Sequence, residues 1–211
     1  LGKLGFIDFA GSSVVHSVGG WVALAVLLII GNRTGRFQDG RKRTFQGSNT
    51  PLAALGALIL WFGWFGFNGG ANGAMDLRIP LILINTFLAA SAGLILSSVM
   101  GIYVMKKPEP MFMITGPIAG LVSITASCAY VDPTEAIIIG AIGGIVSGSG
   151  ILLLEKIKVD DVVSAVPVHL FAGTWATIAV ALFGDFEAMG IERPMIDQLY
   201  IQLIGIVSVG A

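Results

Sequence analysis

The chain has 211 residues, of which 55% are hydrophobic and only 12% are charged, which is half the charged share of about 25% in a soluble domain. Charge this sparse cannot cover a surface that faces water, so the composition excludes a soluble enzyme, a nucleic-acid-binding protein and a disordered chain. The net charge of −1 and the single cysteine, Cys128, exclude a polyanionic partner, a disulfide framework and a cysteine-bound metal cluster. We therefore expect an all-α, polytopic membrane protein.

Seven apolar stretches follow one another along the chain. The stretches without Asp, Glu, Lys or Arg are residues 9–32, 44–75, 79–105, 110–131, 136–154, 162–184 and 198–211. The first six reach the roughly 20 residues that a helix needs to cross a bilayer, and the last is shorter. The chain opens without Met just before one stretch and stops inside another. We predict that residues 1–211 are part of a longer membrane domain, with six complete helices and a truncated seventh.

The basic residues between these stretches predict the orientation of the helices. The odd-numbered connections hold nine of them: Arg33, Arg36, Arg41, Lys42, Arg43, Lys106, Lys107, Lys156 and Lys158. The other side receives Lys3, Arg78 and Arg193. Because cytoplasmic loops of membrane proteins are enriched in Lys and Arg, we place the odd-numbered connections in the cytoplasm.

The two histidines of the chain lie in matching sequence contexts. His16 and His169 each follow an aspartate by eight residues, Asp8 and Asp161, and each is followed four residues later by a glycine. The loop charges make the two helices run in opposite directions. At ~1.5 Å per residue, each histidine lies about 12 Å from its end of the helix, near the midplane of the bilayer. The pattern predicts an inverted repeat of the kind found in transporters.

Two interpretations of the histidine pair remain open. A histidine in a helix is often a hydrogen-bonded structural residue, whereas ionisable groups at the midplane usually face a pathway. Because burial disfavours imidazolium, we expect neutral rings that share a proton or offer a lone pair and an N–H to a small solute. A metal site is not expected, because two histidines lack a third protein ligand.

The aspartates and the aromatic residues also have two interpretations each. Asp8 and Asp161 stand at helix starts, where a carboxylate caps free N–H groups, and we expect Asp160 to be solvated. Residues 61–68 (WFGWFGFN) form either an interfacial aromatic belt or the mouth of a pathway, where rings attract a small cation.

Four separated motifs resemble the ammonium transporter family (Amt/Mep/Rh). They are residues 8–16 (DFAGSSVVH) continuing to 31–33 (GNR), residues 64–68 (WFGFN), residues 119–126 (AGLVSITA) and residues 161–169 (DVVSAVPVH). The resemblance covers essentially the whole chain, in order. It implies a fold of eleven helices in two inverted halves, assembled as a homotrimer, with this chain running from the fifth helix to the last.

The resemblance also assigns roles by position. His16 and His169 match the paired pore histidines, Trp64 matches a pore-lining tryptophan, and Phe67 matches an aromatic gate. Asp8 matches the acidic residue that heads the first motif, with cation recruitment and a structural cap both open, and Asp161 resembles its inverted counterpart.

The sequence departs from the family pattern at three positions. Ala71 stands where many members have a serine that helps to hold ammonium, Ser164 where an acid is frequent, and Pro167 where glycine is common. The missing serine removes one hydrogen bond to the ion, and the proline predicts a different bend at the start of residues 162–184.

We predict passage of ammonium or ammonia across the cell membrane, with membrane lipid and a cytoplasmic regulator as further partners and with no cofactor, nucleic acid or enzymatic reaction. Desolvating an ion is costly in an apolar lumen, whereas neutral ammonia crosses more easily. The alternatives are a membrane domain that senses ammonium without conducting it and a channel for another small neutral solute.

Overall fold

The structure is a computed structural model that describes residues 1–38, 41–45 and 47–211, with only the backbone at 41 and 42. Its elements, in chain order, are the 3₁₀ turn η1 (Gly2–Leu4), the π-helical turn η2 (Ser12–Ser17), α1 (Val18–Ile30), β1 (Phe37–Gln38), β2 (Arg41–Lys42), α2 (Thr50–Ala71), α3 (Ile79–Met105), α4 (Pro110–Thr125), α5 (Pro133–Lys156), the π-helical turn η3 (Val166–Phe171), α6 (Ala172–Phe183) and α7 (Met195–Gly210).

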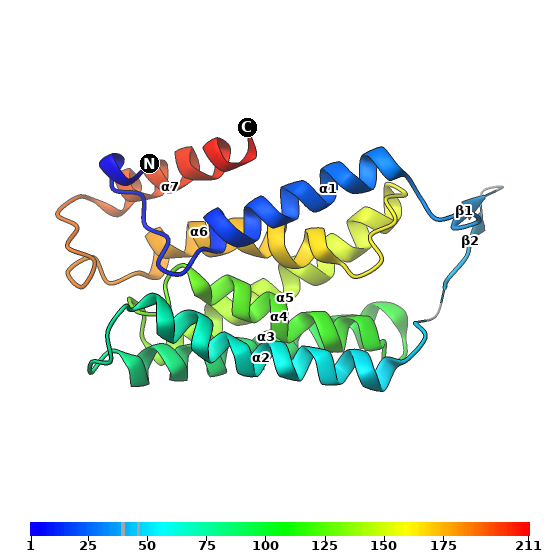
Figure 1. Cartoon of the computed structure of the whole chain (residues 1–211), viewed down its shortest axis with the longest axis horizontal. Helices are drawn as coiled ribbons and strands as arrows, with labels where there is room; N and C mark the ends of the chain where they lie inside the picture. The colour runs from blue at the N-terminus through cyan, green and yellow to red at the C-terminus, as the bar shows by residue number, and fades with distance from the viewer. Residues whose placement is uncertain (39–40, 46) are drawn as a thin grey trace.

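The helices run back and forth along one direction (Figure 1). The described residues contain five helices that are long and apolar enough to cross a membrane, and α4 and α7 are shorter apolar helices. The connections after α1, α3 and α5, which carry most of the basic residues, lie at the same end of the bundle (Figure 1). The short hairpin of β1 and β2, which the sequence analysis did not predict, extends from this end. The predicted all-α membrane bundle is confirmed.

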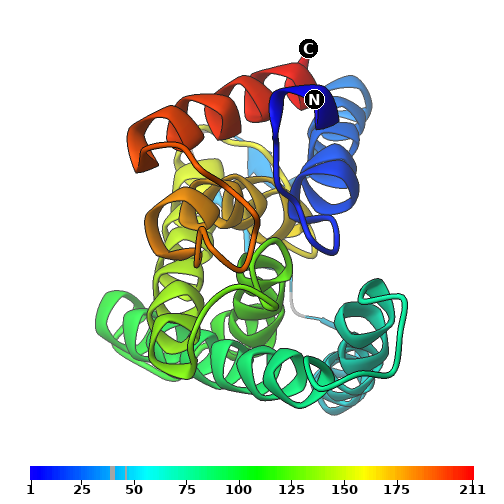
Figure 2. The same cartoon turned by 90° about the vertical axis from the view of Figure 1, so that its left-hand side faces the viewer.

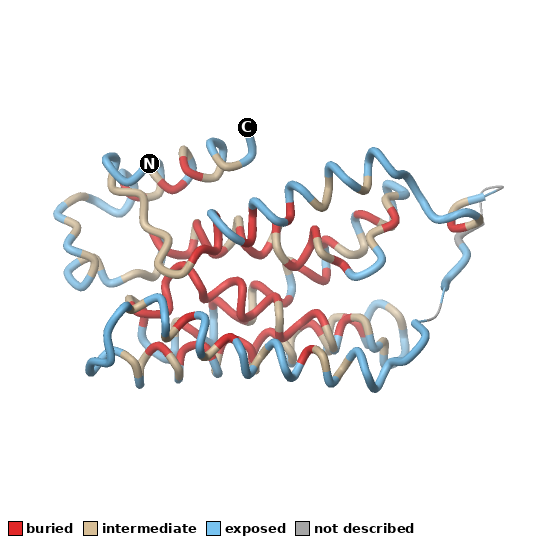
Figure 3. The backbone as a smooth tube through the Cα atoms, viewed as in Figure 1, coloured by how far each residue is buried: buried red, intermediate tan, exposed pale blue. Residues whose placement is uncertain are grey.

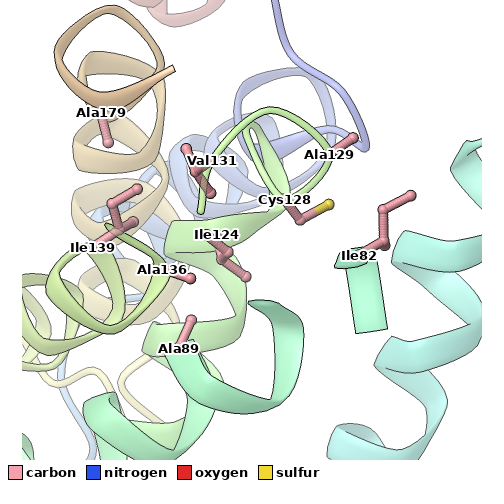
Figure 4. Packing of buried hydrophobic residues seen from close by; sticks show 9 residues of the cluster. All are labelled: Ile82, Ala89, Ile124, Cys128, Ala129, Val131, Ala136, Ile139 and Ala179. Carbon is pink, nitrogen blue, oxygen red and sulfur yellow. The ribbon is translucent and has the colours of Figure 1, made fainter. Parts of the chain in front are cut away.

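Helices α3, α4 and α5 form the most closely packed part of the bundle, because glycines line their contacts. A β-carbon at Gly93 would lie 2.6 Å from the carbonyl oxygen of Gly116, and one at Gly144 would lie 2.6 Å from that of Gly93. Figure 4 shows Ala89 facing Ile124 and Ala136 across the same contacts. Small residues allow membrane helices to approach in this way.

Helix α4 ends at Thr125, six residues before the end of the predicted stretch 110–131. Beyond it the chain turns, and other segments bind its backbone carbonyl groups. Asn85 donates to the carbonyl oxygens of Cys128 and Val131 at 3.0 and 2.7 Å. The backbone N–H of Phe9 donates to the carbonyl oxygen of Ala126 at 3.0 Å. Counting charges cannot detect this end, because the turn is apolar and buried.

Helix α5 begins at Pro133 rather than at the predicted residue 136. Asp132 and Glu135 form a capping box, in which each side chain accepts a hydrogen bond from the backbone N–H of the other residue. Such a box is typical of the start of a helix. The predicted stretch excluded Asp132 and Glu135 because it was defined as free of charged residues.

The exposed outer surface is apolar. Figure 3 shows that burial is concentrated on the inner helices, whereas most of α2 and much of α1 are exposed. Phe62 on α2 and Ile29 on α1 are 79% and 83% exposed. In a membrane, apolar side chains on the outside meet lipid rather than water.

Candidate functional site

Both histidines lie in π-helical turns that begin their helices. His16 is in η2, which continues into α1, and His169 is in η3, which continues into α6. Single π turns inside helices are rare and often mark functional sites. The two composite helices lie side by side and run in opposite directions (Figure 1), as the predicted inverted repeat requires.

Asp8 holds the first of these turns in place. Its carboxylate accepts hydrogen bonds from the backbone N–H groups of Ser12, Ser13 and Val14 at 2.7, 2.9 and 3.0 Å. Burial raises the pKa of Asp8, although these backbone hydrogen bonds act in the opposite direction. The capping geometry leaves cation recruitment by Asp8 as a prediction.

Asp161 does the same for the second turn. Its two carboxylate oxygens accept from the backbone N–H groups of Ala165 and Val166 at 3.0 and 2.8 Å. The residue three positions after each aspartate has a positive φ, 106° at Gly11 and 57° at Ser164. The matching sequence contexts therefore correspond to matching backbone structures.

The two turns meet through glycines of the opposite helix. A β-carbon at Gly20 would lie 2.5 Å from the backbone nitrogen of Leu170, next to His169. A β-carbon at Gly173 would lie 2.6 Å from the hydroxyl of Ser17, next to His16. The glycine four residues after each histidine thus lets the other turn approach.

Four aromatic rings meet where the turns cross. The ring of His16 lies 5.2 Å from that of His169 between centroids, with an interplanar angle of 20°. The ring of His16 also stacks on Trp64 at 4.9 Å and 16°, and Phe67 lies 5.6 Å from both His16 and Trp64. The structure therefore brings together all four residues that the sequence analysis placed along the pathway.

Exposure changes along this row of rings. Phe67 is 40% exposed, whereas Trp64 and His16 are 7% and 8% exposed. The Nε2 atom of His16 is buried and has no hydrogen-bond partner. A buried ring nitrogen of this kind is costly unless a solute, a proton or the other histidine satisfies it. The hydrogen bond that we predict between the two imidazoles stays a prediction.

Several polar residues that support the site were missed by the sequence analysis. The indole N–H of Trp64 donates to the hydroxyl of Thr125 at 2.9 Å. The hydroxyl of Ser13 contacts that of Thr177 on α6. Isolated hydroxyls inside apolar stretches were the available signal, because a buried polar group needs a partner.

Asp160 is buried, so the expectation that it is solvated was wrong. Its carboxylate forms ion pairs with Arg33 at 2.7 Å and with Arg36 at 3.2 Å, and Arg36 also pairs with Glu155 at 2.9 Å. Hydrogen bonding to Arg33 lowers the pKa of Asp160 to about 2. The sequence shows Asp160 beside Asp161, but it does not show that the loop after α1 contacts Asp160.

The departures from the family pattern have local effects. Pro167 is the second residue of η3, a position where a helix needs no backbone N–H. Ala71 ends α2 and is exposed. In the part of the chain that the structure describes, no three His, Cys, Asp or Glu side chains gather to hold a metal ion.

Comparison with known proteins identifies close relatives. A model of the Ammonium Transporter Family matches residues 1–211. The ammonium transporter Amt2 of Archaeoglobus fulgidus is 44% identical over 202 residues, which are 94% of this chain and 43% of that protein. The putative ammonium transporter sll0537 of Synechocystis is 43% identical over 210 residues, or 98% of this chain and 38% of that protein.

Solved structures share the fold. A protein described as "Sensor Amt Protein" has a TM-score of 0.94 and 39% identity, with 99% of this chain and 52% of that chain covered. Mep2 of Candida albicans has a TM-score of 0.90 and 29% identity, with 99% and 48% covered. The chain thus spans about half the length of these relatives or less.

Proposed function

The chain belongs to the ammonium transporter family of integral membrane proteins, and we propose that it forms part of a path along which ammonium or ammonia crosses the membrane. The observation that carries this proposal is the row of four rings, in which Phe67 and Trp64 lead to His16 and then to His169. The row begins at a half-exposed phenylalanine and ends at histidines from two antiparallel helices.

Each part of the row has a chemical task in this proposal. The ring faces of Phe67 and Trp64 attract the ammonium cation. The cation loses its proton on entry, because an unpaired ion is far costlier to bury than neutral ammonia. His16 and His169 then offer ring nitrogens to the solute, and a proton can follow along the same pair. No covalent bond to the protein forms, so the proposed activity is passage rather than enzymatic conversion.

The working unit that we propose is larger than this chain. A homotrimer of the whole protein, surrounded by membrane lipid and contacted by a cytoplasmic regulator, would carry out the passage. These partners are implied by the family resemblance, and the nine basic residues in the odd-numbered connections offer a surface that a regulator could contact.

Replacing the histidines in the full-length protein tests the pathway. His16→Ala and His169→Ala each remove one polar contact from an apolar passage, which costs roughly 1–3 kcal/mol and lowers the rate of methylammonium uptake about 5- to 150-fold. Phe67→Ala changes entry and selectivity while the histidine pair stays in place. Phe62→Ala serves as the control, because that side chain is 79% exposed on the same helix.

Uptake and ammonium-dependent current are measured in proteoliposomes that contain equal amounts of each variant. Unchanged uptake and selectivity in both histidine variants would make the pair structural and would contradict the proposed pathway.

A second candidate function is sensing of ammonium without conduction. It is supported by the structural likeness to the protein described as a sensor, at 39% identity. Binding and flux measured on one preparation distinguish the candidates. Ammonium binding without flux supports the sensor, and flux of another neutral solute in preference to ammonia supports a general channel.

A further inference from the structure

Two glutamines on α7 face the segment that leads to the first capping aspartate. Gln198 and Gln202 are both fully buried. Figures 1 and 2 show α7 beside the first residues of the chain, at one side of the bundle. A buried carboxamide needs hydrogen-bond partners, so those of the two glutamines show what these side chains hold.

Gln202 binds both backbone polar groups of Ile7. Its Oε1 accepts from the N–H of Ile7 at 3.0 Å, and its Nε2 donates to the carbonyl oxygen of Ile7 at 2.7 Å. The same amide accepts from Gln198 at 3.1 Å and donates to the carbonyl oxygen of Thr177 at 3.1 Å. Four bonds are the full capacity of a carboxamide, so the orientation of this side chain is fixed.

These bonds reach the His16 turn by two routes. Ile7 directly precedes Asp8, whose carboxylate holds three backbone N–H groups of the turn. Thr177, whose carbonyl oxygen is also bound by Gln202, contacts Ser13 within the turn through its hydroxyl. The route through Thr177 and Ser13 is buried, and the route through Ile7 and Asp8 is partly buried. Both are short, so we expect a shift of either one to move the histidine.

The second turn has a counterpart to this arrangement. The residue before Asp161 is Asp160, whose backbone N–H donates to Oδ1 of Asn32 at 3.0 Å. A carboxamide from another helix or its end therefore holds the residue before each capping aspartate. At the second turn the ion pairs of Asp160 with Arg33 and Arg36 also hold this residue. Among the described residues, Gln202 alone bonds the backbone of Ile7.

We propose that Gln202 is a positioning residue for passage along the histidine pair, because it fixes Ile7 and Thr177 and thereby sets the place of Asp8 and of the His16 turn. This inference rests on the proposed function. Gln202 acts through the backbone that it holds.

The test uses the full-length protein with two replacements at Gln202. Gln202→Met keeps the length of the side chain and removes all four hydrogen bonds. Gln202→Glu keeps one donor only while the acid is protonated, and deprotonation sets a carboxylate against the carbonyl oxygens of Ile7 and Thr177. The matched control on the same helix is Ser208→Ala, whose hydroxyl binds only the carbonyl oxygen of Ile204.

Hydrogen exchange of the peptide that contains residues 8–17 is measured first, because it reports on the turn whether or not the protein transports. We expect exchange to accelerate about tenfold in Gln202→Met and to stay unchanged in Ser208→Ala. Wild-type exchange in Gln202→Met would overturn the inference, even if the wild-type protein moves no ammonium and the proposed function fails.

Methylammonium uptake is measured next, normalised at each pH to the wild type. Gln202→Met lowers the maximal rate about tenfold at equal protein content. Gln202→Glu approaches the wild-type rate at low pH and loses it as the pH rises. Wild-type rates in Gln202→Met despite faster exchange, or a flat normalised pH profile in Gln202→Glu, would overturn the positioning role.

Discussion

Two contacts hold the indole ring of Trp64, a hydrogen bond at its edge and a stacked ring on its face. Its N–H donates to the hydroxyl of Thr125, and its face stacks on His16 at 4.9 Å. The hydroxyl of Thr125 in turn donates to the carbonyl oxygen of Leu121 within α4 at 2.7 Å. The buried helix α4 therefore sets the orientation of the ring against which the first histidine packs.

Removing this hydroxyl tests the anchor. Thr125→Val keeps the shape of the side chain but leaves the indole N–H of Trp64 buried and unpaired, which costs roughly 1–3 kcal/mol. We expect a lower melting temperature and slower uptake in the full-length protein. Thr125→Ser keeps the hydroxyl and is the control. Equal melting temperatures for Thr125→Val and the wild type would contradict the anchor.

At the scale of elements, the crossing of the two π turns depends on one glycine from each helix. Gly19 and Gly20 are neighbours in α1, but a β-carbon at Gly19 meets nothing within 4 Å, whereas one at Gly20 meets the backbone of Leu170. The backbone cannot move aside as a flexible side chain can. A substitution that adds a β-carbon should therefore be tolerated at Gly19 but not at Gly20.

These neighbours give a matched pair of substitutions. Gly20→Ala should push η3 away from α1 and lower stability by about 1–3 kcal/mol, the usual cost of overpacking, with a loss of uptake because the histidines separate. Gly19→Ala should be neutral or slightly stabilising, since alanine favours the helix by roughly 1 kcal/mol over glycine. Thermal unfolding of both variants measures the change in stability. Equal changes at the two positions would contradict the close contact between α1 and η3.

The ion pairs of Asp160 predict a dependence of stability on pH. Its pKa is lowered from 3.8 to about 2, chiefly by the hydrogen bond from Arg33. A lowered pKa in the folded state means that the carboxylate stabilises the protein above pH ~4 and that this contribution is lost as the pH falls towards 2. We expect Asp160→Asn to be less stable than the wild type by roughly 1.5–3 kcal/mol at pH 7.

The measurement is unfolding of the wild type and Asp160→Asn between pH 2 and 7. The difference should shrink as the pH falls below about 4. A difference that stays constant over this range would show that ionisation of Asp160 does not contribute.

Periodic and charge-based features of the sequence predicted the elements and the pairing of the rings. The apolar stretches placed the helices, because lipid demands apolar side chains, and the Asp–His spacing placed both histidines in equivalent turns. The end of α4 and the burial of Asp160 were not predicted. Both depend on partners distant in sequence, such as Asn85 and Arg33, and no local pattern reports such contacts.

At the scale of the whole molecule, the bundle combines two kinds of helix packing. Helices α3, α4 and α5 pack through glycines, with little exposed surface between them. By contrast, η2, α6 and α7 are joined by buried polar contacts. The rigid glycine-packed layer supports α2, which carries Trp64 and Phe67. The polar layer carries the histidines, so the proposed path lies where the two layers meet.

The direction in which this bundle crosses the membrane is set by its loops. Nine basic residues lie at the hairpin end, eight in the connections and Lys156 at the end of α5, and three lie on the other side. The hairpin end should therefore be cytoplasmic. Gln38 in the hairpin and Leu77 at the opposite end are both exposed, and the native Cys128 is buried. Single cysteines at these two positions therefore report on the two sides, with little background from this part of the protein.

An impermeant thiol reagent added to intact cells should label Leu77→Cys rapidly and Gln38→Cys only after the membrane is made permeable. The opposite order would invert the bundle. Under that outcome the hairpin would face outwards, and the half-exposed Phe67, which lies towards the other end of α2, would open to the cytoplasm. Entry of ammonium from outside at the aromatic rings would then have to be abandoned, although the pairing of His16 with His169 inside the bundle would stand.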